Sequence, residues 1–163
     1  PRLKESRLAN KIVSEIRTSR GMFFEEEENP FIHRIERRVS ELMNVPLEHA
    51  EGLQVLHYGP GQEYKAHYDF FAPNTPSAMN NRISTLIIYL NDVEEGGETV
   101  FPLLNLEVTP KRGSALYFEY FYHQHALNEL TLHRSAPVIR GEKWVATQWM
   151  RRQRIRDFGL ISS

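Results

Sequence analysis

The sequence Ile83-Ser84-Thr85-Leu86-Ile87-Ile88-Tyr89-Leu90 is almost continuously apolar. A short run of this kind lacks the polar alternation of a strand that faces water on one side, and it is typical of a β-strand buried on both faces. We therefore expect this segment to lie in a sheet that helices cover.

Short β-rich segments surround that strand along the chain, separated by Gly, Pro and Asn. The predicted strands are Leu53–Tyr58, Tyr64–Asp69, Ile83–Leu90, Thr99–Phe101, Leu106–Val108, Ser114–Phe121, Thr131–His133 and Lys143–Met150. A series of short strands with turn residues between them is typical of a jelly roll. With neither an internal repeat nor a second domain in the sequence, we expect residues 1–163 to form one mainly β domain.

Helical spacing is confined mainly to the first third of the chain. Asn29 and Pro30 are a capping residue and a first-turn proline, and an apolar stripe at 3.6-residue spacing follows them. The stripe consists of Phe31, Ile32, Ile35, Val39, Leu42 and Met43. A second N-terminal helix is predicted over Leu8–Ile16, ending before Arg17–Gly21.

The composition is that of a globular protein, with 40% hydrophobic and 25% charged residues. The net charge of −1 disfavours nucleic acid as the main partner. Because no run of 18 apolar residues occurs, we expect no membrane span, and no leader is visible. The absence of cysteine excludes disulfides, iron–sulfur clusters, Cys-ligated zinc and thiol nucleophiles, and it permits the cytoplasmic location that we expect.

Any metal bound by such a chain must use histidines and carboxylates. His67 and Asp69 stand at positions i and i+2 of a predicted strand, so their side chains project from the same face and can meet at one ion. A His-x-Asp pair also occurs by chance, and a distant third ligand is needed; His133 is the candidate. Two histidines and one carboxylate cap one face of Fe(II) and leave positions open for substrate chemistry. We interpret His123-Gln124-His125 as a loop.

Lys143 begins the last predicted strand, ten residues after His133. It shares a strand face with Val145, Thr147 and Trp149, so it is expected to point into the barrel. A basic residue there suggests an anion to be held, because a buried cation needs a carboxylate partner.

Motifs along nearly the whole chain occur together in one order and spacing. They are Arg17-Thr18-Ser19, Tyr58, residues 62–69, residues 81–85, residues 89–99, Leu132-His133, Pro137-Val138 and residues 141–144. In this arrangement the chain resembles the collagen-type prolyl 4-hydroxylases, particularly the small bacterial ones, a branch of the Fe(II)/2-oxoglutarate dioxygenases.

The resemblance implies a double-stranded β-helix, or jelly roll, with N-terminal helices packed on its larger sheet. It also implies that His67, Asp69 and His133 hold Fe(II). The resemblance further implies that Lys143 binds the distal carboxylate of 2-oxoglutarate, assisted by the hydroxyls of Thr99 and Tyr58. The other end of the keto acid is expected to chelate the iron. The implied reaction uses O2 and 2-oxoglutarate to hydroxylate C4 of a peptidyl proline, releasing succinate and CO2, with ascorbate rescuing uncoupled turnover.

The same resemblance places Tyr64, Arg82 and Trp149 near a groove for a proline-containing peptide, which a collagen-like sequence would suit. It implies that the stretch Arg17–Asn29 forms a mobile loop over this groove. That loop carries the acidic run Glu25–Glu28, interpreted as solvated, with a preference for cationic peptides as the alternative. The oligomeric state is left open, a homodimer included.

Two features depart from the family pattern. Arg134 follows His133 where the family usually has a small residue, so it either affects peptide access or points outward. The chain also begins at Pro1, inside the family domain, so we expect the segment that supplies the first helix and an edge strand to be missing.

Two other functions stay open. One is a 2-oxoglutarate hydroxylase that acts on a different protein or residue, because a fold does not choose its substrate. The other is a cupin-like binding or sensing module, since Gly61-x5-His67-x-Asp69 partly imitates the opening of a cupin motif. Lys143 argues against the cupin, whose metal site does not need a buried lysine.

Overall fold

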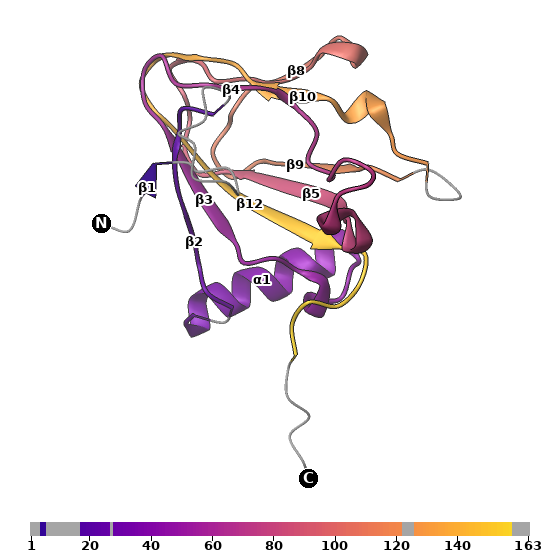
Figure 1. Cartoon of the computed structure of the whole chain (residues 1–163). Helices are drawn as coiled ribbons and strands as arrows, with labels where there is room; N and C mark the ends of the chain where they lie inside the picture. The colour runs from indigo at the N-terminus through magenta and orange to yellow at the C-terminus, as the bar shows by residue number, and fades with distance from the viewer. Residues whose placement is uncertain (1–3, 6–16, 27, 122–125, 158–163) are drawn as a thin grey trace.

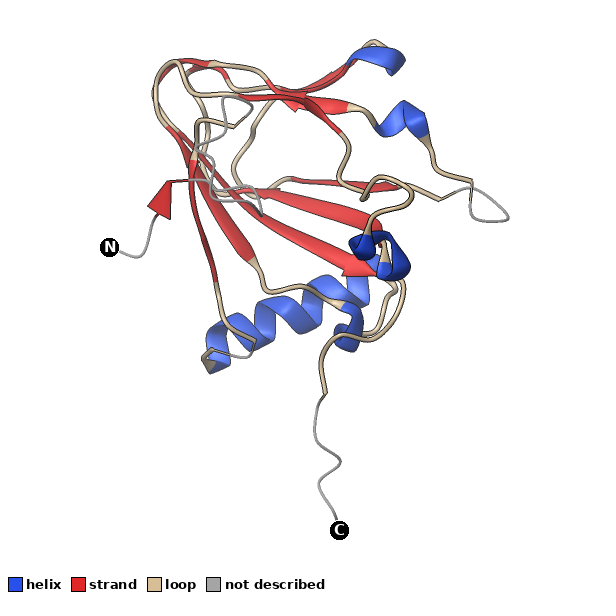
Figure 2. Cartoon of the chain, viewed as in Figure 1, coloured by secondary structure: helices blue, strands red, loops and turns tan. Residues whose placement is uncertain are grey.

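Two antiparallel sheets lie one above the other, and a helix covers the outer face of the larger sheet (Figure 1). The computed structural model describes residues 4–5, 17–26, 28–121 and 126–157. Strands predominate over helical turns in this part of the chain, as Figure 2 shows by colour. The chain is therefore mainly β, as predicted.

The larger sheet has six strands in the order β1-β2-β3-β12-β5-β9. Their bounds are Lys4–Glu5 for β1, Arg20–Phe23 for β2, Gln54–Tyr58 for β3, Lys143–Arg151 for β12, Arg82–Tyr89 for β5 and Ala115–Glu119 for β9. β5 lies between β12 and β9, with Leu86 opposite Gln148 on one side and Tyr117 on the other. The almost continuously apolar strand is thus an interior strand of the sheet, as predicted.

The smaller sheet has four strands in the order β4-β10-β7-β8. Their bounds are Tyr64–His67 for β4, His133–Ser135 for β10, Thr99–Phe101 for β7 and Leu106–Val108 for β8. A two-stranded sheet pairs β6 (Glu95–Gly96) with β11 (Val138–Arg140). Gly96 has a φ of +81°, and a Cβ there would lie 2.4 Å from the carbonyl oxygen of Pro137, so this close pairing requires glycine.

Helix α1 runs from Pro30 to Met43, as the sequence predicts. Asn29 Oδ1 accepts hydrogen bonds from the backbone amides of Phe31 (3.0 Å) and Ile32 (3.1 Å), which caps the helix. The buried face of α1 packs on the larger sheet; the cluster contains Val39, Met43, Ala50, Leu86 and Met150. This packing gives the larger sheet one covered face and leaves its other face for the smaller sheet.

Short 3-10 turns connect the remaining elements. They are η1 (Leu47–His49), η2 (Pro76–Asn80), η3 (Pro102–Leu104) and η5 (Glu129–Thr131). Within the described ranges, α1 is the one α-helix, and none of the helices there is long and apolar enough to cross a membrane. The predicted helix Leu8–Ile16 and the loop His123–His125 lie outside the described residues.

The structure corrects one expectation in the N-terminal third. The resemblance implied a loop over Arg17–Asn29, but Arg20–Phe23 forms β2 in the larger sheet, with Gly21 opposite Leu56 of β3. A Cβ on Gly21 would lie 2.7 Å from Leu56 Cδ2, so glycine allows the two strands to approach. Part of the segment Arg17–Asn29, which was expected to be a loop over the peptide groove, is therefore a strand of the larger sheet.

The predicted strand Thr131–His133 is wrong in its position. Glu129–Thr131 forms the turn η5, and the strand β10 begins only at His133. Asn128 Oδ1 accepts a hydrogen bond from the backbone amide of Leu130 (3.1 Å), which favours a turn over an extended conformation there. His133 therefore starts a strand rather than ending one.

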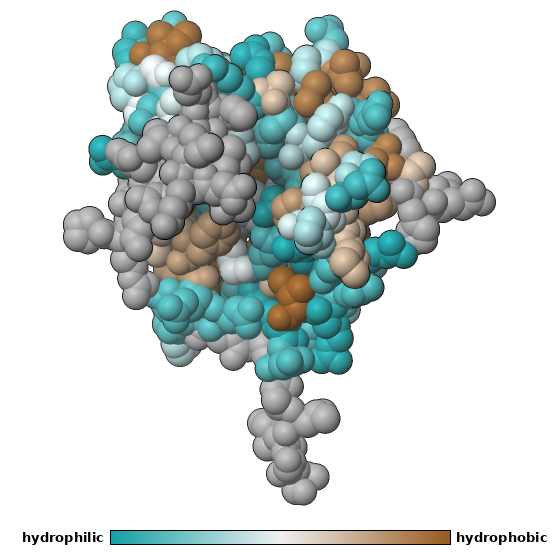
Figure 3. Space-filling view, viewed as in Figure 1, coloured by the Kyte–Doolittle hydropathy of each residue, from teal (hydrophilic) through white to brown (hydrophobic). Residues whose placement is uncertain are grey.

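The surface shown in Figure 3 is mainly hydrophilic, and the hydrophobic residues on this face form separate groups rather than one continuous area. Exposed leucines do occur at the edge of the smaller sheet, at Leu103 and Leu104 in η3 and at Leu106 in the edge strand β8. The main apolar area of the molecule is thus buried between α1 and the larger sheet and between the two sheets.

Candidate active site

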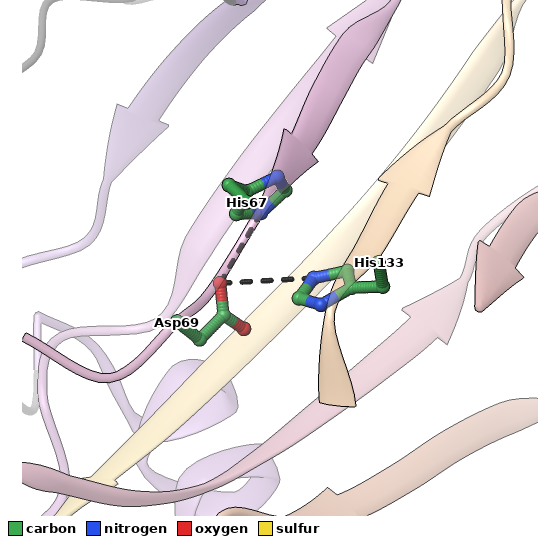
Figure 4. A group of neighbouring side chains, drawn as sticks. All are labelled: His67, Asp69 and His133. Atoms are coloured by element: carbon green, nitrogen blue, oxygen red, sulfur yellow. Dashed lines mark ion pairs between the residues drawn. The ribbon is translucent and has the colours of Figure 1, made fainter. Parts of the chain in front are cut away.

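Three side chains converge between the two sheets, and Figure 4 shows them turned toward one point. The ligand atoms of His67, Asp69 and His133 all lie within 4.8 Å of one another. Asp69 Oδ1 is 3.3 Å from His67 Nε2 and 3.7 Å from His133 Nε2. His67 ends β4 and His133 begins β10, and the two residues are opposite each other in these paired strands. The pairing of distant strands thus brings the predicted metal ligands together.

Both histidine rings are held by the backbone of their own segments. His67 Nδ1 lies 2.7 Å from the carbonyl oxygen of Lys65, and His133 Nδ1 lies 2.9 Å from that of Thr131. Because a carbonyl oxygen only accepts hydrogen bonds, each Nδ1 must carry the proton, which leaves each Nε2 with a lone pair. A metal ligand in a protein is usually oriented in this way.

The second carboxylate oxygen of Asp69, Oδ2, is held by hydrogen bonds. Asp69 Oδ2 accepts hydrogen bonds from Thr85 Oγ1 (2.6 Å), Tyr120 OH (3.3 Å) and Trp149 Nε1 (3.1 Å). Burial alone raises the pKa of Asp69, but His133, His67 and the Arg82 guanidinium hold it well below its usual range. Asp69 is therefore a carboxylate whose Oδ1 is directed at the two imidazoles.

His133 is buried among apolar and aromatic groups. This burial lowers its pKa by more than the neighbouring Asp69 raises it. The ring is therefore neutral near pH 7, which is the state that binds a metal ion. The three side chains together present two imidazole nitrogens and one anionic oxygen at one place.

Lys143 lies deeper in the same interior, at 2% exposure. Its Nζ donates hydrogen bonds to the carbonyl oxygen of Gly97 (2.6 Å) and to Ser135 Oγ (2.9 Å). Burial lowers its pKa to about 8, although Glu98 opposes this shift. Among the described residues, no carboxylate oxygen forms an ion pair with this ammonium. The predicted carboxylate partner is thus not supplied by the described part of the chain.

Tyr58 and Thr99, the other predicted cofactor residues, are buried beside Lys143. The Lys143 ammonium lies 5.4 Å from the centre of the Tyr58 ring. Burial raises the pKa of Tyr58, so its phenol stays protonated, and its hydroxyl bonds to Ser19. Thr99 Oγ1 is 2.7 Å from Tyr89 OH. The buried ammonium therefore has the hydroxyl of Ser135 and the rings of Tyr58 and Tyr89 as neighbours.

The three predicted substrate residues lie close to the metal-ligand candidates His67 and Asp69. The Tyr64 ring stacks on His67 with 3.5 Å between ring centres. The Arg82 guanidinium lies 4.0 Å above the Trp149 ring, and Glu51 binds its Nε and Nη2, both at 2.8 Å. The Arg82 guanidinium is therefore less accessible to a peptide than the sequence suggested, because it is hydrogen-bonded to Glu51 and stacked on the Trp149 indole.

A small cavity joins these groups. Its lining comes from both sheets and contains Leu56, Tyr58, Tyr64, His67, Asp69, Ile87, Thr99, His133, Ser135, Val145, Thr147 and Trp149. Lys143 and Arg82 lie behind this lining; Lys143 reaches it through the hydroxyl of Ser135. The arrangement offers a cation-binding group at one end and a buried cation at the other, which suits a small dianion that bridges metal and lysine.

Sequence reasoning missed several residues that hold the site. Thr85 and Tyr120 bind Asp69 Oδ2, Ser135 binds Lys143, and Glu51 binds Arg82. Thr85 had one available signal, because it is a hydroxyl residue inside an otherwise apolar strand. Arg134, which departs from the family pattern, alternates with His133 and Ser135 along β10 and so lies on the outer side of the smaller sheet, opposite Val100.

The chain was also compared with known protein families and with individual relatives. The model of the 2OG-Fe(II) oxygenase superfamily matches residues 53–151. An Arabidopsis thaliana protein named probable prolyl 4-hydroxylase 3 is 41% identical over 158 residues, which cover 84% of this chain and 55% of the relative. Human prolyl 4-hydroxylase subunit alpha-1 is 34% identical over 160 residues, covering 92% of this chain and 30% of the relative. The chain thus spans about half or less of these curated relatives.

Among solved structures, a viral collagen prolyl hydroxylase from Paramecium bursaria Chlorella virus-1, determined as a 2OG complex, superposes with a TM-score of 0.72. It is 35% identical, and the match covers 83% of this chain and 79% of the viral chain. A Pseudomonas putida prolyl-4-hydroxylase structure matches with a TM-score of 0.67 at 20% identity, which supports the fold alone.

Proposed function

This chain belongs to the 2OG-Fe(II) oxygenase superfamily, in its prolyl 4-hydroxylase branch, and we propose that it hydroxylates C4 of peptidyl proline with O2 and 2-oxoglutarate, releasing succinate and CO2. The observation that carries the proposal is the convergence of His67 Nε2, His133 Nε2 and Asp69 Oδ1, with the other polar atoms of all three side chains already bound.

The residues present fit an Fe(II) ion. Two imidazole nitrogens and one carboxylate oxygen form the donor set of a facial triad, which leaves the remaining coordination positions for other ligands. We propose that His67, Asp69 and His133 hold the ion. Fe(II) bound there supplies the activation of O2 and the coupled oxidation of 2-oxoglutarate. The protein's own part is to orient the three ligands and to keep Asp69 ionised.

The residues at the other end fit a carboxylate. The Lys143 ammonium is buried and has a carbonyl, a hydroxyl and aromatic rings around it, so an incoming carboxylate would complete its charge balance. We propose that Lys143 binds the distal carboxylate of 2-oxoglutarate, with the hydroxyls of Tyr58 and Thr99 beside it. Charge-assisted hydrogen bonds of this kind are the strong ones.

We also propose that the peptide lies along Tyr64 and Trp149, whose rings line the cavity on the histidine side. Aromatic faces suit pyrrolidine rings, and a proline-rich chain in the polyproline II conformation has already lost much of its entropy. The Arg82 guanidinium stacks 4.0 Å from the centre of the Trp149 ring, and we propose that it orients this ring for the peptide. Collagen-like repeats are the substrate class that we propose.

The finer architecture follows from the same observations. The two sheets are linked across the interior, by Tyr89 OH to Thr99 Oγ1 (2.7 Å) and by Lys143 Nζ to Ser135 Oγ (2.9 Å). These bonds join strands of different sheets around one interior, and they support our proposal of a double-stranded β-helix, or jelly roll, that forms one domain.

The test supplies the anaerobically purified protein with Fe(II), 2-oxoglutarate, ascorbate and a proline-rich or collagen-like peptide in air-saturated buffer, which provides the O2. We expect succinate release and 4-hydroxyproline in the peptide, and we expect His133→Ala to abolish both together with Fe(II) binding. Succinate release that only another protein or residue stimulates would favour the other hydroxylase function. Metal binding without any 2-oxoglutarate turnover would favour the cupin-like module. Sedimentation of the same samples tests for a homodimer.

A further inference from the structure

Arg156 is a fully buried arginine, at 1% exposure, that does not line the cavity. Its Nη2 and Nη1 bind the carboxylate of Glu36 in helix α1 at 2.7 and 3.1 Å. Its Nε also donates to the carbonyl oxygen of Ala50 (2.7 Å), and its Nη2 donates to that of Glu51 (2.8 Å). The guanidinium thus fixes the backbone at residues 50–51 in addition to pairing with Glu36.

Glu51 links Arg156 to the larger sheet through hydrogen bonds to residues of β5 and β12. Its backbone amide donates to the carbonyl oxygen of Trp149 (2.9 Å). Its carboxylate binds Arg82 Nε and Nη2, both at 2.8 Å, and Arg151 Nε at 2.6 Å. A carboxylate between two arginines has few alternative positions, so moving the backbone of Glu51 moves Arg82 with it.

Arg82 and Trp149 both contact the predicted metal ligand Asp69. Arg82 Nη1 donates to the carbonyl oxygen of Asp69 (3.3 Å), and Trp149 Nε1 donates to Asp69 Oδ2 (3.1 Å). The guanidinium stacks 4.0 Å above the indole. A continuous series of hydrogen bonds therefore runs from Arg156 through Glu51 to the backbone and the side chain of Asp69.

The N-terminal segment touches the same arginine. Glu26 Oε1 lies 3.8 Å from Arg156 Nε. Glu26 belongs to the acidic run Glu25–Glu28, in the connection between β2 and α1. The contact gives this part of the acidic run a place beside a buried cation on the α1 side of the molecule.

We propose that Arg156 is a positioning residue for Asp69, which acts through the backbone of Glu51 and the side chains of Arg82 and Trp149. The inference rests on the proposed function only for the identity of the metal. It assigns to the C-terminal segment a share in the geometry of the metal site, and it predicts that Arg156 matters for metal affinity separately from its ion pair with Glu36.

The experiment separates these two roles. Arg156→Met alone leaves a buried carboxylate unpaired, so its effects mix folding with positioning. Glu36→Leu/Arg156→Met removes the whole ion pair and replaces it with apolar groups of similar size, which restores stability while the contacts to Ala50 and Glu51 remain lost. Arg154→Met is the matched control, because Arg154 lies in the same segment with an exposed side chain (63%) and only a 3.9 Å contact to Glu48.

Three readouts are measured on each variant in a Trp144→Phe background: the melting temperature, the dissociation constant of Co(II), and the emission spectrum of Trp149. For the double variant we expect a melting temperature near that of the parent, a Co(II) dissociation constant raised about tenfold, as for other residues that orient metal ligands, and a shifted emission maximum. For Arg154→Met we expect all three to stay unchanged.

An unchanged Co(II) dissociation constant and an unchanged emission spectrum in the folded double variant would overturn the proposal. If the parent protein binds no metal, the proposed function fails. The positioning role is then judged by the Trp149 emission alone, where an unchanged spectrum also overturns it and a shift supports it.

Discussion

Arg156 and Lys143 are two cations buried almost completely in the same small fold, at 1% and 2% exposure. Arg156 has a carboxylate of its own chain, Glu36, in a bidentate pair. Lys143 has a carbonyl, a hydroxyl and the rings of Tyr58 and Tyr89, but no carboxylate partner among the residues that the structure describes. The chain pairs one of these cations internally, and we propose that a ligand pairs with the other.

This difference teaches that burial alone does not reveal what a charged residue is for. A buried charge costs several kcal/mol unless it is paired, so an unpaired one persists where something outside the chain pairs with it. The buried partner of Arg156 indicates a role in holding the fold together. For Lys143, which has no carboxylate partner in the described part of the chain, we propose that the partner is 2-oxoglutarate.

The largest expected effect concerns stability. Arg156→Met should lower the free energy of unfolding by about 3–5 kcal/mol, because it leaves the Glu36 carboxylate buried without a partner. Urea denaturation followed by circular dichroism measures this change. A loss below about 1 kcal/mol would mean that the buried Glu36 carboxylate does not depend on Arg156 as its partner, and the contrast with Lys143 would disappear.

The second prediction is that substituting Lys143 affects ligand binding rather than stability. Lys143→Met should leave the free energy of unfolding unchanged or higher, because it removes a buried charge that has no ion-pair partner in the described structure. It should weaken 2-oxoglutarate binding by an amount on the order of 2–3 kcal/mol, the usual worth of a charge-assisted contact. Calorimetric titration of the metal-loaded protein measures the affinity. A stability loss like that of Arg156→Met with unaltered affinity would contradict the assigned role.

The third prediction is a pH dependence of the same contact. The pKa of Lys143 is lowered to about 8 by burial in the ligand-free protein, and a bound carboxylate raises it. Ligand binding therefore takes up a proton above pH 8, and the 2-oxoglutarate dissociation constant should be flat below pH 8 and rise about tenfold for each further pH unit. The Lys143→Met protein is the control and should not show this rise. A dissociation constant that stays flat from pH 7 to 9.5 in the parent protein would show that Lys143 does not bind 2-oxoglutarate.

The smallest expected effect is at Thr99. Its Oγ1 is 2.7 Å from Tyr89 OH, and both groups are neutral. Thr99→Val should weaken 2-oxoglutarate binding by about 1 kcal/mol, as for one uncharged hydrogen bond, with little change in the affinity for Co(II). Equal losses of ligand and metal affinity would instead mean that the substitution disturbs the whole interior.

Much of the fold was predictable because it rests on local patterns. The cap at Asn29, the apolar stripe of α1 and the buried strand in β5 each follow from a few neighbouring residues. The strand β2 was missed because Arg20–Phe23 has no apolar alternation and depends on the closeness of Gly21 to Leu56. The strand at His133 was misplaced because the polar cap of Asn128, rather than the apolar run after it, determines the local conformation.

The site was predictable where its residues are close in sequence or belong to a family motif. His67 and Asp69 were paired by expecting a strand over Tyr64–Asp69, but β4 ends at His67 and Asp69 lies just beyond it. His133 and Lys143 were candidates from residue type and position, and the resemblance supplied their specific roles. The partners that complete the site come from distant elements; Tyr120, for example, reaches Asp69 from the end of β9. Glu36 offered a signal, because it is an acid on the buried side of an amphipathic helix, but nothing local could identify Arg156 as its partner.

His67 and His133 face each other across β4 and β10, in a chain that contains no cysteine. An ion held by both rings is therefore a cross-link between two strands that are far apart along the polypeptide. Like a disulfide, such a link takes conformational freedom from the unfolded chain, and it is present only when metal is supplied. If the proposed ion is bound there, the resistance of the smaller sheet to proteases should therefore rise when metal is supplied.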